Sequence, residues 1–509
     1  MPGSPEAAGL DLRLVPAALT SWAVTAAGIL WDQAGSLIAI AVSVATTAAA
    51  GGWGNRGRTA DQRALAAGVS AVLLVGGGFA VAVTLRVDEV RHHAVSGHLG
   101  EVTAVVVAPT ETPRVLAGAR MMFRGSLLEL DGAQSSGKVM VFASGAGYSR
   151  LTAGQPAAFR ARITMPKRRD LTVAVLTANG EPTLGDAAPI HRAAHHIRDR
   201  FAQASRMVLP ADQAGMLPAL VLGDTSTVPG QTTQDFRTSG LAHLTAVSGA
   251  NVTIVCGAVL LTATLIGPRA AVGLAAVTLL GFVVVVQPSP SVLRAAVMGA
   301  ITLLAVLSHR RRQALPALAA TVVVLMVGAP ELAVDVGFAL SVSATGALVL
   351  IAPVWSRRLT ERGWPRPLAA AVSVAVAAQL VTAPLVAGIS GSVSLVAVGA
   401  NLVVAPVIPP ITVIGSAAAA LCPLWPAGAE LLIRFTGPEV WWLMSVARWA
   451  ATVPAAAVPV PSGGAGVVTV AVAALGAAVV WHRWCSRCHR DVTRSCGEPR
   501  GNRSAPDPG

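Results

Sequence analysis

Three polar side chains fall inside an otherwise apolar stretch in the middle of the chain. His243, Ser248 and Asn251 stand among the small and aliphatic residues of 236–265. An unpaired polar group is costly at membrane depth, so such residues usually face a protein interior and often have a function. Their imidazole, hydroxyl and amide groups could offer rotatable hydrogen bonds to a polar substrate. Hydrogen bonding between packed helices, assisted by Gly249, is the structural alternative.

Polar residues recur in the later apolar stretches. Asn401 precedes prolines at 406, 409 and 410, and a helix broken at membrane depth persists only where protein or a water-filled cavity satisfies its backbone. Arg294 lies near the end of its stretch, where snorkelling of the guanidinium is the alternative. Stretches that each contribute one or two polar groups predict a lined path across the membrane. Its residues are Asp224, His243, Ser248, Asn251, Arg294, Asp335, Ser341, Thr345, Gln379 and Asn401.

The composition identifies the class of protein that would hold such a path. The 509 residues are 53% hydrophobic and only 12% charged, and the mean hydropathy is +0.63. A soluble domain has about a quarter charged residues, so the low charge excludes a single soluble enzyme. The apolar residues come in blocks of about 20, which also excludes a disordered chain. We predict a polytopic α-helical membrane protein with about twelve spans, since about 20 apolar residues cross a bilayer. The span count stays open between 402 and 450.

Arginines on alternate loops predict the orientation. The turn at 51–63 carries three arginines, and 310–312 and 357–366 are also rich in them, whereas 287–291, 329–335 and 389–394 contain no Lys or Arg. Cytoplasmic loops are enriched in positive charge. We therefore expect a multi-pass protein of the cell membrane whose Arg-bearing loops face the cytoplasm.

Five runs rich in Val, Leu and Phe lie in a polar insert that this orientation places outside the cell. They cover 101–109, 114–131, 137–144, 155–166 and 171–179, with turn residues between them. Arg160 and Arg162 alternate with apolar residues and should share one face. Five short strands suit an extracytoplasmic small β-barrel of OB type, a fold that often binds single-stranded nucleic acid.

The insert divides the chain into five regions. We expect N-terminal transmembrane helices over 1–90, the OB-like domain over 95–186, an amphipathic linker over 187–235, a transmembrane domain over 236–484 and a basic, disordered cytoplasmic tail over 485–509. The linker begins with a basic helix over 191–206. Ile197, Phe201 and Val208 mark its apolar face, with Arg192, Arg198, Arg200 and Arg206 opposite, so it should lie at the membrane interface.

An ordered set of motifs resembles the ComEC family of competence DNA-uptake channels over roughly 95–450. They are Leu-Gly-Asp224, Ser-Gly-Leu-Ala-His243-Leu-Thr-Ala-Val-Ser248-Gly-Ala-Asn251, Arg294-Ala-Ala-Val-Met, Asp335-Val-Gly-Phe-Ala-Leu-Ser341, Gln379 before Ala-Pro384, and Asn401 before Ala-Pro406. The resemblance implies an inner-membrane channel for single-stranded transforming DNA, with these residues in its core. Many members add a metallo-β-lactamase-like domain. We find no His-x-His-x-Asp-His motif in the tail, so we predict neither nuclease nor other enzymatic activity, and no metal or cofactor.

A DNA channel needs an entrance that attracts phosphate, and the net charge of +13 fits a polyanionic partner. On the insert we predict DNA contacts, mainly electrostatic and tolerant of sequence. The candidates are Arg114, Arg120, Arg124, Lys138, Arg150, Arg160 and Arg162. The alternative is that these cations solubilise the insert or contact anionic lipid headgroups.

Partners follow from the same resemblance. Besides single-stranded DNA and the lipid bilayer, we expect a DNA receptor and a cytoplasmic motor of a competence system, since no ATPase motif is found. A homo-oligomer stays open as an alternative, because a pore lined by small residues can need a second copy to close it.

Two other functions stay open. A secondary transporter of a small solute would use His243, Asp335 and Gln379 as substrate or proton sites. A membrane anchor would use only its OB-like domain, to bind a partner.

Overall fold

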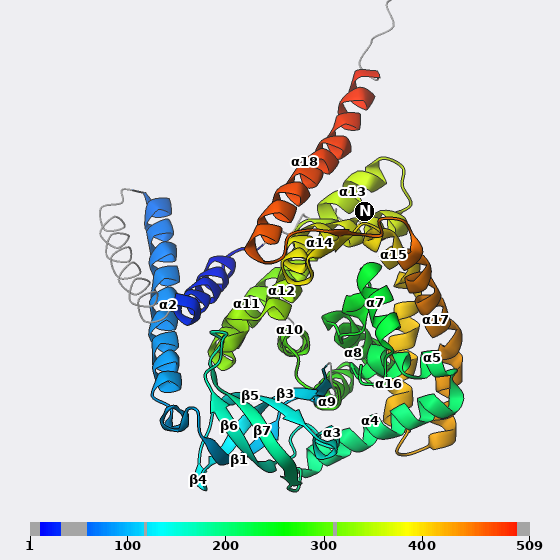
Figure 1. Cartoon of the computed structure of the whole chain (residues 1–509). Coiled ribbons are helices and arrows are strands. Elements are labelled where there is room, and N and C mark those ends of the chain that lie inside the picture. Colours follow the sequence, from blue (N-terminus) through cyan, green and yellow to red (C-terminus); the bar gives the residue numbers. More distant parts are fainter. Residues whose placement is uncertain (1–10, 32–58, 117–119, 309–312, 496–509) are drawn as a thin grey trace, which may run out of the picture.

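The computed structural model describes residues 11–31, 59–116, 120–308 and 313–495. It combines membrane-length helices with one closed β-barrel, so the predicted fold class is confirmed (Figure 1). The predicted span at 33–50 lies outside the described residues.

The barrel is built from five long strands, and all five predicted runs are confirmed. They are β1 (Val102–Pro109), β3 (Arg120–Leu130), β5 (Lys138–Ser144), β6 (Ala157–Thr164) and β7 (Thr172–Leu184), and the short β2 (Arg114–Val115) and β4 (Ala133–Gln134) pair with β3. The order β1-β6-β7-β5-β3 closes through β3 onto β1. Pairings in the barrel are antiparallel except that of β5 with β7. Closure leaves no free edge on these strands.

Strict alternation in β6 shows why the barrel forms. Phe159, Ala161 and Ile163 point into its core, whereas Arg160 and Arg162 are exposed on one outer face, as predicted. A strand with this period has one side for the core and one for water.

Tyr148 fills one end of the barrel core. It lies on α3 (Ala146–Ser149), is fully buried, and its ring meets that of Phe159 edge-on with centroids 5.6 Å apart. Its hydroxyl has no hydrogen-bond partner among the described residues. Burial, helped by the negative charge of Glu181, raises the pKa of Tyr148 to about 12.

This raised pKa predicts an alkaline transition. Tyr148 is the only tyrosine in the sequence, so the ultraviolet absorbance of tyrosinate reports this residue alone. We expect half-ionisation near pH 12 in the folded protein and near pH 10 in the denatured control, where the value should be that of a free tyrosine. Because the folded pKa is the higher one, the neutral phenol stabilises the fold fully below about pH 10, and this contribution is lost as the pH rises through the folded value. A midpoint near 10 in the folded protein would show that the phenol is not buried.

The remaining described chain is mostly helical. The helix Val15–Trp31 and α2 (Ala60–Arg91) precede the barrel, joined to it by η1 (Ala94–His98), and α4 (Pro189–Val208), α5 (Ala211–Ala214), α6 (Met216–Leu222) and α7 (Gly230–Thr238) follow it. The membrane domain contains α8 (Gly249–Ala263), α9 (Pro268–Val286), α10 (Pro290–Leu307), α11 (Ala314–Gly328), α12 (Val336–Leu350), α13 (Ala352–Glu361), α14 (Arg366–Ser390), α15 (Ala397–Val404), α16 (Ile408–Leu421), α17 (Pro426–Thr452) and α18 (Gly463–Ser495). A short hairpin pairs β8 (Ser392–Ser394) with β9 (Ala457–Pro459). The helix of α18 continues into the segment predicted as a disordered tail.

Seven of the described helical segments are long and apolar enough to cross a membrane, and three shorter apolar helices accompany them. The helix α17, which covers the uncertain span 428–450, is not among the seven and contains Glu430, Arg434, Glu439 and Arg448. The chain between Asn401 and Pro410 is less broken than expected. A single 3₁₀ turn, η5 (Ala405–Val407), joins α15 to α16 because Pro409 and Pro410 fall in the first turn of α16, where the missing N–H costs little.

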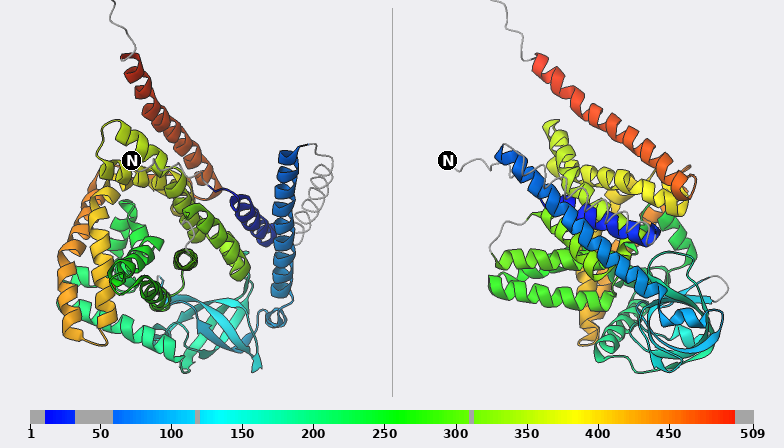
Figure 2. Two further views of the ribbon diagram at one scale, coloured as in Figure 1. Left: turned by 180° about the vertical axis from the view of Figure 1, so that it is seen from behind. Right: turned by 90° about the vertical axis from the view of Figure 1, so that its left-hand side faces the viewer.

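The barrel and the end of α18 lie at opposite ends of the helical frame (Figures 1 and 2). Two contacts attach the barrel to loops that the charge pattern places outside the cell. Lys138 pairs with Glu331 on η4 (Pro330–Val334), and the Thr112 N–H donates to Gln287 Oε1 over 3.2 Å. The helix α13, which carries Arg357 and Arg358, lies at the end of the frame away from the barrel (Figure 1), in agreement with the predicted orientation.

Candidate functional site

The first turn of α8 brings two of the predicted residues together. Ser248 is the N-cap, and its Oγ donates to Asn251 Oδ1 over 3.2 Å. Asn251 is only 6% exposed, and its Nδ2 donates to the Leu220 carbonyl of α6 over 3.1 Å. The expectation that His243 and Ser248 lie within the span is wrong, because α8 begins at Gly249 and both residues precede it. His243 lies on η3 (Ala242–Leu244), with Nδ1 3.2 Å from the Gly240 carbonyl oxygen.

Arg294 turns into the helix bundle and does not snorkel to the interface. Its side chain, on α10, is 6% exposed. The Nε donates to Ser341 Oγ on α12 over 2.7 Å, and Nη1 donates to Met298 Sδ over 3.1 Å. The Ser291 hydroxyl lies 3.3 Å from that of Ser341.

The pair Ser248 and Asn251 and the pair Arg294 and Ser341 come together at Gly249. A Cβ atom on Gly249 would lie 2.5 Å from Arg294 Nη2, so a side chain at position 249 would force the guanidinium to move. The guanidinium takes its present position against the start of α8 because residue 249 has no side chain. We call Ser248, Gly249, Asn251, Arg294 and Ser341 the central polar cluster.

The other predicted residues make local contacts, and only Thr345 among those described below bonds to a residue of this cluster, through the Ser341 backbone. Asp335 caps α12 by accepting from the Phe338 N–H over 2.9 Å. Within their own helices, Thr345 Oγ1 donates to the Ser341 carbonyl and Asn401 Nδ2 to the Ala397 carbonyl. Gln379 Nε2 lies 3.4 Å from the Ser394 carbonyl oxygen. No described hydrogen bond joins His243, Asp335 and Gln379 to one another.

Asp224 has a partner that the sequence reasoning missed. Arg198 of α4 is 7% exposed, and its Nη2 lies 3.9 Å from Asp224 Oδ2. Its Nη1 donates to the carbonyls of Leu222, over 2.9 Å, and Val285, over 3.1 Å. Burial lowers the pKa of Arg198, and the charge of Asp224 opposes that shift.

The placement of Arg198 on the polar face of the 191–206 helix is therefore wrong. It lies three residues before the buried Phe201, and this spacing puts both side chains on one helix face. Its guanidinium joins the C-terminal ends of α6 and α9, where unpaired carbonyls favour a cation.

The seven predicted DNA-contacting residues are exposed but do not share one face. Arg120 and Arg124 on β3 and Lys138 on β5 alternate with buried residues, and the positions that point outward with them carry no carboxylate from Arg120 to Ser126 or from Lys138 to Ser144. β3 and β5 lie on the side of the barrel nearest the membrane helices (Figure 1). We call this surface the β3–β5 face. Arg114 pairs with Glu111 over 3.2 Å, and Arg150 follows α3.

Arg160 and Arg162 lie on β6, two strands from β3 through β1. Their guanidinium groups donate to carbonyls of Val102 and Gly100, over 3.3 and 3.4 Å. Arg160 also lines a shallow groove with Glu129 and Glu181. Two carboxylates make this surface less attractive to a polyanion than the β3–β5 face.

The loop between β6 and β7 adds three cations that the sequence reasoning did not single out. Lys167, Arg168 and Arg169 are consecutive and exposed, and Arg169 Nη1 donates to the Leu30 carbonyl over 2.6 Å. In OB folds the loop at this position borders the binding face. The run of three basic residues was visible in the sequence.

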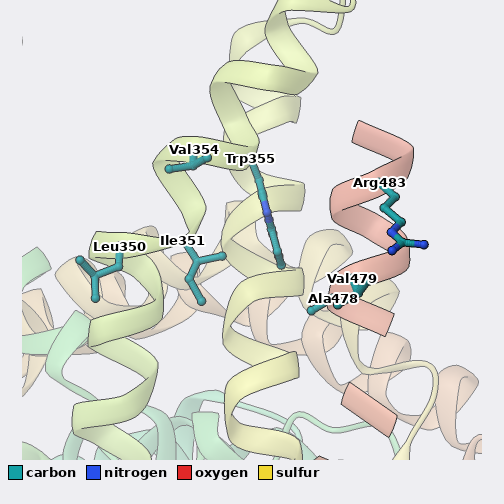
Figure 3. Close-up of a pocket in the computed structure, with 7 residues that line it drawn as sticks. All are labelled: Leu350, Ile351, Val354, Trp355, Ala478, Val479 and Arg483. Carbon is teal, nitrogen blue, oxygen red and sulfur yellow. The ribbon is translucent and has the colours of Figure 1, made fainter. Parts of the chain in front are cut away.

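A second hollow, of about 430 Å³, lies between α12, α13 and α18 (Figure 3). It is lined by Leu350, Ile351, Val354, Trp355, Ala478, Val479 and Arg483. The close-up shows Arg483 pointing away from Trp355. The lining is largely apolar and contains none of the predicted site residues, so it is typical of a surface covered by lipid.

Two comparisons with known proteins give a match. A family model described as "Competence protein" matches residues 220–485, more than half of the chain. "ComE operon protein 3" of Bacillus subtilis (strain 168) is 29% identical over 175 residues, which cover 33% of this chain and 22% of that protein. The match thus spans about a fifth of that relative's length. No solved structure matches.

Proposed function

The chain belongs to the competence protein family, and from this premise we propose that it is the inner-membrane channel through which single-stranded transforming DNA reaches the cytoplasm. The observation that carries the proposal is the position of the β3–β5 face. A cationic surface whose own outward positions on β3 and β5 carry no carboxylate adjoins the membrane helices that the family model covers, and its Lys138 pairs with Glu331 of η4. The resemblance to ComEC proteins supports the same function.

In this proposal the β3–β5 face collects the strand. Arg120 and Arg124 would compensate phosphate charge, because Lys138 is already paired with Glu331. The side chains of Met122, Met140 and Phe142, which are half-buried on the same face, would contact bases. With one aromatic ring on this face, binding would be mainly electrostatic and insensitive to sequence.

The central polar cluster would then line the path inside the membrane, together with the other residues predicted for it. Translocation needs no covalent step, because a conduit must bind its cargo well enough to admit it and weakly enough to release it. We propose no catalytic residue. A DNA receptor and a cytoplasmic motor would supply capture and energy, and the membrane potential or a proton gradient are alternative sources.

The test of this function is import of fluorescently labelled DNA in a naturally competent host. A strain that lacks the gene should hold the label outside the inner membrane, and the intact chain should restore label in the cytoplasm and the recovery of transformants. Equal import with and without the protein, in a strain shown to take up DNA, would refute the proposal.

Removing charges from the barrel tests which of its two cationic surfaces, the β3–β5 face or the β6 surface, binds the strand. We expect Arg120→Gln with Arg124→Gln to weaken binding of an oligothymidylate to the full chain in lipid nanodiscs. The slope of log affinity against log salt should become shallower by about 1.4, since each phosphate neutralised on a single strand contributes about 0.7. Fluorescence anisotropy over a salt series measures this slope.

The matched control is Arg160→Gln with Arg162→Gln, which removes the same charge from β6. We expect this pair to leave the slope within the error of the intact chain. If the β6 pair weakened binding as much as the β3 pair, the β3–β5 face would not be the strand-binding surface.

A further inference from the structure

Arg294 is a buried cation without a compensating anion. Among the described residues, no carboxylate lies within ion-pair distance of its guanidinium, and its two hydrogen-bond acceptors, Ser341 Oγ and Met298 Sδ, are neutral. The side chain is 94% removed from solvent, since it is 6% exposed. A buried charge is costly unless it is paired. An anion supplied from outside the chain would relieve this cost.

The start of α8 lacks a side-chain cap and adds positive potential at the same place. Ser248 stands at the N-cap, but its hydroxyl donates to Asn251 and caps nothing. The backbone N–H groups of Gly249 and Ala250 have no partner among the described residues. The N-terminus of a helix carries about half a positive charge and presents N–H donors to anions, and α8 is 15 residues long.

The guanidinium and this helix end face one another across Gly249. Arg294 Nη2 lies 2.5 Å from the position that a Cβ of residue 249 would take, and no described hydrogen bond uses this nitrogen. Ser248 and Gly249 are half-buried and Ala250 is exposed, so a small anion could reach the N–H groups. Ser341 holds Nε from the other side and fixes the orientation of the guanidinium plane.

We propose that Arg294 and the N-terminus of α8 form a binding site for one tetrahedral phosphate group. The remaining N–H groups of the guanidinium and the free backbone N–H groups would share its oxygens, a pattern that suits phosphate. The assignment of that phosphate to the backbone of a DNA strand rests on the proposed function; the anion site itself does not.

The position of Arg294 suits a phosphate-binding site on the path, close to the outer end of its membrane helix. Arg294 lies about one turn, roughly 6 Å, from the start of α10, and the loop before that start contacts the barrel through Gln287. A strand that leaves the β3–β5 face would meet Arg294 early. A single cation and one helix end would hold one phosphate loosely, as conduction requires.

The experiment measures binding of inorganic phosphate to the full chain in nanodiscs of neutral lipid by phosphorus NMR saturation transfer, with chloride keeping the ionic strength constant. Arg294→Gln removes the cation. Gly249→Ala keeps every charge but places a methyl group 2.5 Å from the present position of Nη2, so the guanidinium has to move away from the start of α8. We expect each variant to weaken the saturable binding at least about tenfold, the size of one charged hydrogen bond.

Two matched controls accompany them. Gly257→Ala makes the same change on α8 at a position with open space around it, and Arg269→Gln removes an exposed arginine from α9. Both should bind phosphate like the intact chain. If the Arg294→Gln protein does not fold in the membrane, the comparison of Gly249→Ala with Gly257→Ala still tests the phosphate site. Phosphate binding unchanged in Gly249→Ala would overturn the proposal.

The outcome is independent of the DNA-import test. Phosphate binding that depends on Arg294, in a protein whose deletion leaves DNA import unchanged, would establish the anion site and refute the channel. If DNA import requires the protein but phosphate binding does not depend on Arg294 or Gly249, the channel is supported and the anion site is refuted.

Discussion

Replacing Arg198 with Met should lower the stability of the folded protein by about 3 kcal/mol, because loss of one partner from a buried charged network costs about that much. Methionine keeps the length and apolar character of the side chain but cannot donate. The carbonyls of Leu222 and Val285 would lose their donor, and Asp224 would lose its cation. A change of this size shifts the folding equilibrium by about a hundredfold.

Thermal unfolding of the full chain in detergent, followed by tryptophan fluorescence, would measure this loss. The control is Arg206→Met on the same helix, whose side chain is exposed, and exposed substitutions usually stay within about 0.5 kcal/mol. Equal melting temperatures for the two variants would mean that Arg198 does not hold α4 against α6 and α9.

The prediction from sequence succeeded where the period of apolar residues within one segment determines its structure. The strands β5 and β6 alternate buried with outward-facing residues over seven and eight positions, so such strands, and the shared face of Arg160 and Arg162, could be predicted. Which strands are neighbours depends on closure of the sheet, and alternation does not contain that information. The separation of Arg120 and Arg124 from Arg160 and Arg162 therefore required the structure.

The errors in the membrane domain have two physical causes. Ser248 at the N-cap is a helix-start signal, but the apolar run around it masked the signal, so His243 and Ser248 were placed within the membrane span. Arg198 was assigned by charge to a polar face, although its spacing from Phe201 placed it on the buried one. Its acceptors belong to α6 and α9, and no local pattern in α4 identifies them.

Replacing Asn251 with Leu should reduce DNA import by at least about tenfold, because removing a buried hydrogen-bond partner costs about 1–3 kcal/mol. Asn251 ties the start of α8 to the Leu220 carbonyl and engages the Ser248 hydroxyl. In the Leu variant that hydroxyl would be free to cap α8 and to compete with an anion for its N–H groups. The variant thus alters the central polar cluster without removing a charge.

Import of labelled DNA and transformant recovery in the complemented deletion strain measure the effect, with membrane insertion and protein level checked for each variant. Thr253→Val is the control, because this side chain is exposed on α8 and its hydroxyl bonds only to the Gly249 carbonyl of the same helix. Full import by a correctly inserted Asn251→Leu protein, together with a defect in the Arg120 and Arg124 variant, would mean that only the barrel acts. The chain would then be a membrane anchor for a strand-binding domain, since a conduit cannot be indifferent to the residue that positions the first turn of α8.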